Sequence, residues 1–330
     1  YFSKMGGSND PLSDDDLKNF NIFLAVMVVI GMIGNFTFTV TVFLKSVESR
    51  YTTLLLRNQS LIDFNVCLIS FLIILIPSNV TGVYFIDWIG CRVFYSQTIY
   101  WFNVHMSIIN LVFTAFDRYW AVVTAQTYKR NIHLKILTTY LVLFLAPSII
   151  IVPSSLQSRL LPNGTCIPIP QFDGDIMNNF WKGYAILWSM VGYVIPTCFF
   201  SYLYGRVYFF LRKMMVGKTS KKVDNYQKAT KMFTMSTFVI TVFFILSFAY
   251  DTLYYILGFL GVTSYVISSP LGIAGVFLTA LNSVINPFVY IILMKSFRNK
   301  YLQVWIPKFI IVKFSREIED KEYSTNTSTI

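Results

Sequence analysis

The stretch "LVFTAFDRYWAVV" (111–123) closes a long apolar run with an adjacent acid and base, Asp117 and Arg118. A charge near hydrocarbon is costly, so such a pair needs a partner or a function. Of the 330 residues, 55% are hydrophobic and only 13% are charged, whereas a soluble domain carries about 25% charged residues. The composition therefore predicts an integral membrane protein.

Seven stretches are continuously apolar and long enough for a membrane-spanning helix, which takes about 20 residues. They lie near residues 20–44, 53–77, 92–116, 134–153, 184–211, 232–257 and 267–294. A span must be a helix or part of a closed barrel, and these stretches lack the alternation of barrel strands. We expect an all-α seven-transmembrane bundle over 20–294, between an extracellular tail (1–19) and a cytoplasmic segment (295–330).

The basic residues predict how the bundle is oriented. The segments after the first, third, fifth and seventh spans hold 22 of the 27 lysines and arginines. Because cytoplasmic loops carry the excess of Lys and Arg, the N-terminus is expected outside a multi-pass plasma-membrane protein. This basic collar suits anionic lipid head groups and acidic partners better than nucleic acid.

The cysteines agree with this orientation. Cys91 and Cys166 fall on the expected outer side, where an oxidising compartment permits a disulfide. Asn163, in the triplet Asn-Gly-Thr on the same side, is a glycosylation acceptor.

Two motifs carry a resemblance to a known family. "DRY" (117–119) ends the third expected span, and "NSVINPFVYIILMKSFR" (282–298) ends the seventh. In order and spacing they resemble the rhodopsin-like (class A) G-protein-coupled receptors, over residues 20 to about 303. The resemblance implies a receptor, not an enzyme, that activates a heterotrimeric G protein. It also implies a Cys91–Cys166 disulfide and a short amphipathic eighth helix.

The resemblance further implies a two-state switch in which Arg118 pairs with Asp117 at rest and turns inward in the active state. The implied switch residues are Asp117, Arg118, Tyr119, Tyr204, Asn286, Pro287 and Tyr290. The implied core relay consists of Ile108, Pro196, Ile240 and Phe244. The alternative for Arg118 is a snorkelling side chain that marks the membrane boundary.

Asp63 is a carboxylate in the middle of the second span, and such a residue is a functional-site hypothesis by default. One carboxylate with several neutral oxygens suits a hard cation such as sodium, and the family has a sodium pocket at these positions. The expected sodium ligands are Asp63, Asn103, Ser107, Asn282, Ser283 and Asn286. The alternative is an aspartate that only joins helices by hydrogen bonds.

Several departures from the family pattern restrict the class of ligand and change the expected form of the switch. Tyr100 stands where an amine receptor of this family has Asp, so a monoamine ligand is not expected. Ala280 stands where a photoreceptor needs Lys, so a retinal Schiff base is excluded. The sixth span lacks Cys-Trp-x-Pro, with Phe244 at the Trp position. Tyr226 replaces the acid that would lock Arg118, and Cys91 lies two residues further from Arg118 than is usual.

One acid, Asp251, lies near the outer end of the sixth span. Together with the aromatic residues it forms the candidate ligand-binding set Tyr100, Trp101, Asp251, Tyr254 and Tyr255. An acid among aromatic rings suits a basic neuropeptide that carries Arg or Lys. The alternatives are aromatic residues that only pack, and a receptor for a non-amine small molecule. A transporter or channel would need repeats or a chain of buried charges, and the sequence shows neither.

The C-terminal sequence "EYSTNTSTI" (322–330) contains five serine and threonine residues that could be phosphorylated. They are Ser324, Thr325, Thr327, Ser328 and Thr329. Phosphate there would allow a basic partner to dock, so a receptor kinase and arrestin are candidate partners. A solvated disordered tail is the equal alternative.

Overall fold

The computed structural model of the protein describes residues 14–46, 49–75, 81–128, 130–156, 158–162, 164, 166–168, 175–215, 221–260, 262 and 270–305. Its helices are α1 (Asp14–Leu44), α2 (Arg50–Leu75), α3 (Tyr84–Ile89), α4 (Thr98–Val122), α5 (Ile132–Ser155), α6 (Asp175–Ser189), α7 (Ile195–Met215), α8 (Lys221–Phe259), α9 (Pro270–Leu293) and α10 (Lys295–Trp305). Two π-helices, η2 (Gly90–Tyr95) and η4 (Met190–Val194), a 3-10 turn η3 (Ala125–Thr127) and two strands are the other elements of the described residues. The predicted glycosylation site Asn163 and the C-terminal Ser/Thr cluster lie outside the described residues.

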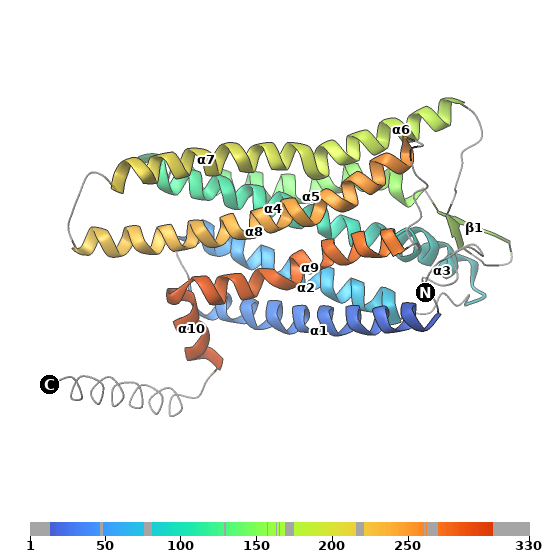
Figure 1. Ribbon diagram of the computed structural model, residues 1–330, viewed down its shortest axis with the longest axis horizontal. Coiled ribbons are helices and arrows are strands. Elements are labelled where there is room, and N and C mark those ends of the chain that lie inside the picture. The colour runs from blue at the N-terminus through green and yellow to red at the C-terminus, as the bar shows by residue number, and fades with distance from the viewer. Residues whose placement is uncertain are drawn as a thin grey trace.

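Within the described part of the chain, seven helical segments are long and apolar enough to cross a membrane. They lie side by side along the long axis of the molecule (Figure 1). The predicted all-α, seven-helix membrane fold is therefore confirmed. α8 is the longest element, with 39 residues, or about 58 Å of helix. It lacks the proline that usually bends this span, and Leu246, at that position, is 67% exposed on its outer face.

The third span is longer than its apolar pattern predicted. It covers Tyr84–Val122 rather than 92–116. Asp117 and Arg118 lie in its last turns, as expected for a motif that ends the span, and neighbouring side chains satisfy their charges within the bundle.

This third span is also interrupted. Between α3 and α4 the chain forms the π-helix η2, and Gln97 then adopts a left-handed backbone with φ of 55°. A π-turn holds more residues than an α-turn, so the interruption takes up the extra chain between Cys91 and Arg118. The left-handed conformation is uncommon for a residue with a side chain, and it separates the two parts of the span.

The two ends of the bundle differ in structure (Figure 1). At one end, the antiparallel strands β1 (Ser158–Leu160) and β2 (Cys166–Pro168) form a hairpin. A disulfide joins Cys91 in η2 to Cys166 in β2. We call this the hairpin end.

At the opposite end, α10 turns away from α9 and packs on α1. The indole nitrogen Nε1 of Trp305 donates to Thr41 Oγ1 at 3.0 Å. The ring of Phe297 stacks on that of Phe38, with 4.5 Å between centroids. We call this the α10 end; the short eighth helix expected after the seventh span is present there.

The apolar core runs through the length of the bundle around α4. It includes Leu111 near the α10 end, Phe244 at mid-height and Tyr100 near the hairpin end, all almost fully buried. Large apolar side chains are exposed on the outer faces, such as Ile149 at 73%. That pattern is expected of helices that face lipid. The core therefore holds α4 as the central helix that connects the two ends.

Candidate functional site

Asp117 and Arg118 form a buried ion pair near the α10 end of α4, with 0% and 1% exposure. Thr52 on α2 donates to Asp117 Oδ2 at 2.8 Å, and Arg118 Nη2 donates to the same Thr52 hydroxyl at 2.8 Å. A buried charge is tolerated only when it is paired and hydrogen-bonded. The contacts with α2 explain how this acid and base remain inside the helix.

Tyr128, which follows η3, ties the connection between α4 and α5 to the ion pair. Its hydroxyl donates to Asp117 Oδ1 at 2.6 Å and lies 2.5 Å from Ser49 Oγ. Lys135 Nζ on α5 donates to the carbonyl oxygen of Tyr128 at 2.8 Å. Burial and the nearby Asp117 carboxylate raise the pKa of Tyr128, so its hydroxyl stays protonated and remains a donor.

An aromatic ring on α8 meets Arg118. The guanidinium carbon lies 4.0 Å from the ring centroid of Phe233, which is 0% exposed. The same ring stacks on Tyr290 of α9, with 5.9 Å between centroids. The side chain of Tyr226, at the position of the expected lock, is outside the described residues. Arg118 is therefore held between a carboxylate on its own helix and a π face on α8.

The other expected switch residues lie on α4, α7 and α9. Tyr204 is buried and packs edge-on against Phe238, and Tyr119 is half-buried. The hydroxyl of Tyr290 is buried, with no hydrogen-bond partner among the described residues. Pro287 lies inside α9, where its ring packs against Gly34 of α1. The ring of Phe233 therefore contacts both the guanidinium of Arg118 and the ring of Tyr290.

The four expected relay residues lie at mid-height in the bundle. Ile108 of α4 and Ile240 and Phe244 of α8 are buried in one apolar cluster. The ring of Phe244 packs edge-on against Phe200, 5.6 Å away. Pro196 is buried at the second residue of α7, directly after the π-helix η4. A shift of α8 would therefore change the packing of α4 and α7.

A second polar cluster surrounds Asp63, which is 0% exposed in α2. Ser107 of α4 and Ser283 of α9 each donate to Oδ1 at 2.9 Å. Asn286 donates to Oδ2 at 2.6 Å, and Gln59 donates to the same oxygen at 2.9 Å. The cluster joins three helices through one carboxylate.

Two of the expected sodium ligands do not touch Asp63. Asn103 Nδ2 donates to the carbonyl oxygen of Ile99 on its own helix at 2.8 Å. Asn282 Oδ1 is buried, with no hydrogen-bond partner among the described residues. Gln59 takes part instead, although it was not among the predicted ligands.

The neutral oxygens of the serines suit a hard cation. The amide nitrogen of Gln59 does not, because its N–H bonds occupy the face of the carboxylate that an ion would use. In this arrangement the residues do not fit sodium, and the sodium site stays a prediction.

The predicted ligand residues gather at the hairpin end. Asp251 is 5% exposed, and no hydrogen bond or ion pair to its carboxylate is found in the described part of the chain. It lies against α9, where a Cβ added to Gly275 would be 2.6 Å from its Oδ1. A buried carboxylate without a partner is costly, so a ligand that supplied a cation would be favoured there.

The aromatic side chains at the hairpin end form one connected set. Trp188 at the end of α6 packs edge-on against Trp101, with centroids 5.7 Å apart, and lies 6.1 Å from Tyr255. Trp188 links these two residues, although it was not among the residues predicted from the sequence. Tyr254 is buried on the same turn of α8.

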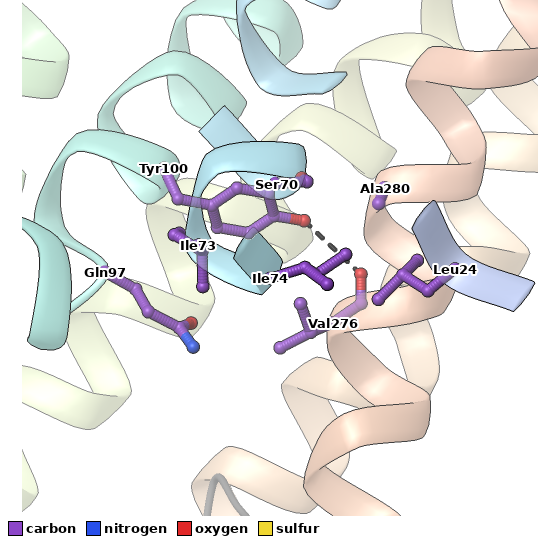
Figure 2. A pocket seen from close by; sticks show the side chains of 8 residues that line it. All are labelled: Leu24, Ser70, Ile73, Ile74, Gln97, Tyr100, Val276 and Ala280. Carbon is purple, nitrogen blue, oxygen red and sulfur yellow. Dashed lines mark hydrogen bonds between the residues drawn. The ribbon is translucent and has the colours of Figure 1, made fainter. Parts of the chain in front are cut away.

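A small cavity lies beside Tyr100, between α1, α2, α4 and α9 (Figure 2). Its lining residues are Leu24, Ser70, Ile73, Ile74, Gln97, Tyr100, Val276 and Ala280. The Tyr100 hydroxyl donates to the carbonyl oxygen of Val276 at 3.3 Å and lies 2.7 Å from Thr279 Oγ1. The cavity volume of about 20 Å³ suits one water molecule and not a ligand, so Tyr100 here ties α4 to α9.

Seven helices that could span a membrane, a buried acid–base pair at one end and an acid with no partner among the described residues at the other are the features of a seven-helix membrane protein of the receptor type. The sequence pattern of the 7 transmembrane receptors (rhodopsin family) matches residues 34–290, and the chain belongs to this family. It is therefore a G-protein-coupled receptor. No individual curated protein matches the chain.

Proposed function

We propose that this receptor binds an extracellular ligand at the hairpin end and activates a heterotrimeric G protein at the α10 end, in the plasma membrane. The single observation that carries the proposal is the buried Arg118, paired with Asp117, at one end of α4, with a cluster of buried aromatic residues at the other. The basic collar supports this orientation, because Lys and Arg gather on the cytoplasmic side. The disulfide at the hairpin end agrees with an extracellular location.

In the resting state, Asp117 and Phe233 hold Arg118 inside the bundle. Activation moves α8 away from α4, so the ring leaves the guanidinium. Arg118 then turns toward Tyr204 and Tyr290 and meets the G protein. The relay residue Phe244 transmits the movement, because it packs against α7 and lies on the same helix as Phe233.

The ligand carries a cationic group that pairs with Asp251. A basic peptide satisfies this requirement through an Arg or Lys side chain, and the aromatic set around Trp188 supplies rings for a cation–π contact. Phosphorylation of the C-terminal cluster and binding of arrestin belong to the same proposal and rest on the sequence alone.

The test is a screen of basic peptides on cells that express the receptor, with calcium and cyclic nucleotide measured together. Once an agonist is found, Arg118→Ala is compared with Arg130→Ala at matched surface expression. Arg130 is exposed at the same end, so it controls for the loss of one positive charge. The proposal requires that only Arg118→Ala abolish signalling while agonist binding persists. Normal signalling by Arg118→Ala would show that this buried arginine only stabilises the packing of the helices and takes no part in the switch.

A further inference from the structure

Gln59 completes the polar cluster around Asp63. It lies one turn before Asp63 on α2 and is 3% exposed. Its Nε2 is 2.9 Å from Asp63 Oδ2 and 2.6 Å from Ser107 Oγ, while its Oε1 accepts from Asn110 Nδ2 at 2.8 Å. A carboxylate can only accept hydrogen bonds, so the Gln59 atom facing it is the nitrogen. The chemistry of both neighbours therefore fixes the orientation of the amide.

With Gln59 in place, the Asp63 carboxylate accepts four hydrogen bonds, two on each oxygen. Hydrogen bonds to an ionised group are short and strong, so four of them replace much of the solvation that the buried charge lost. A sodium ion would have to use the same lone pairs. It would also have to approach amide N–H bonds whose dipoles point toward it.

We propose that the Gln59 carboxamide takes the place of a cation in this receptor, so that its stability does not depend on sodium. The amide is a tethered substitute: its N–H groups present partial positive charge to Asp63 and Ser107. The Asp63, Ser107 and Ser283 oxygens are otherwise suited to a hard cation. Removal of the amide is therefore expected to create a sodium site.

Gln59→Leu removes the amide and keeps a side chain of similar size. Asn110 then loses one acceptor, but its Nδ2 also donates to the carbonyl oxygen of Leu55 at 2.9 Å and remains paired. Asn58→Leu is the matched control, because it removes an amide from the same turn of α2. The Asn58 amide accepts from Tyr140 of α5 and not from the cluster.

The experiment measures the melting temperature of the full-length receptor in lipid nanodiscs, by tryptophan fluorescence, in sodium chloride and in choline chloride at equal ionic strength. Wild type and Asn58→Leu are expected to melt equally in both salts. Gln59→Leu is expected to melt higher in sodium, since an ion that binds only the folded state stabilises it. Adding Asp63→Asn to Gln59→Leu should abolish this rise.

Two results overturn the proposal. One is a wild-type melting temperature that rises in sodium and loses this rise in Asp63→Asn, a result that needs no Gln59 variant to fold. The other is a folded Gln59→Leu receptor that remains insensitive to sodium, because Gln59 would then not be what excludes the ion. Neither agonist nor G protein is present, so the outcome is independent of the proposed ligand and coupling.

Discussion

Replacing Phe233 by leucine is expected to raise basal signalling. The ring lies 4.0 Å from the Arg118 guanidinium carbon, and both side chains are at most 1% exposed. Leucine keeps an apolar side chain at this core position but has no π face. The variant therefore weakens the contact between α8 and the arginine, while Asp117 still pairs with it.

The magnitude follows from the burial of the pair. A desolvated cation–π contact contributes about 2 kcal/mol. If it exists only in the resting state, its loss shifts the equilibrium toward the active state by about 2 kcal/mol, or about 30-fold. An exposed contact of this kind would contribute about 0.5–1 kcal/mol, and the shift would be about two- to fivefold.

The assay is nucleotide exchange on a purified G protein by equal amounts of folded receptor without agonist. Phe238→Leu is the control: this α8 ring packs against Tyr204 but is 42% exposed on the outer face. A folded Phe233→Leu receptor with the basal exchange rate of Phe238→Leu would refute the view that the ring restrains Arg118. Calorimetric or fluorescence melting separates a signalling effect from general loss of packing.

Three further predictions concern single side chains. Tyr128→Phe removes a donor to the Asp117 carboxylate, where a hydrogen bond to a charge contributes about 1.5–3 kcal/mol; it should raise basal exchange, and an unchanged rate would place Tyr128 outside the switch. Asp251→Asn should weaken a cationic agonist by about 2–5 kcal/mol in a radioligand assay, and unchanged affinity would remove Asp251 from the binding site. Gly275→Ala places a methyl group 2.6 Å from Asp251 Oδ1, so it should displace the carboxylate and lower the affinity for the same agonist. An unaffected affinity would mean that α9 does not position this acid.

Part of the polar core was predictable from helical spacing. Ser107 and Ser283 were expected near Asp63, and the structure places their hydroxyls in contact with it. Gln59 could have been found by the same rule, because residues four apart share one face of a helix. Asn103 lies one turn nearer the hairpin end and bonds its own helix, which spacing along the sequence does not reveal.

Contacts between helices were harder to predict from the sequence. The sequence showed that α8 offers no acid at the expected lock, but the placement of Phe233 over Arg118 depends on how α8 is rotated against α4. The third span shows the same limit. The sequence showed that Cys91 lies two residues further from Arg118 than is usual. The place where the helix takes up these residues depends on packing and on the Cys91–Cys166 link.

The interruption at Gln97 has a practical consequence for comparing this receptor with its relatives. Position numbers counted back from Arg118 along a regular helix remain valid as far as Thr98. Beyond it, the left-handed residue and the π-turns rotate the chain, so a residue aligned by number in another receptor faces a different direction. Contacts transferred from relatives to Tyr95 or Arg92 by alignment would be assigned to the wrong side of the span. Superposition anchored on the hairpin gives the correct correspondence there.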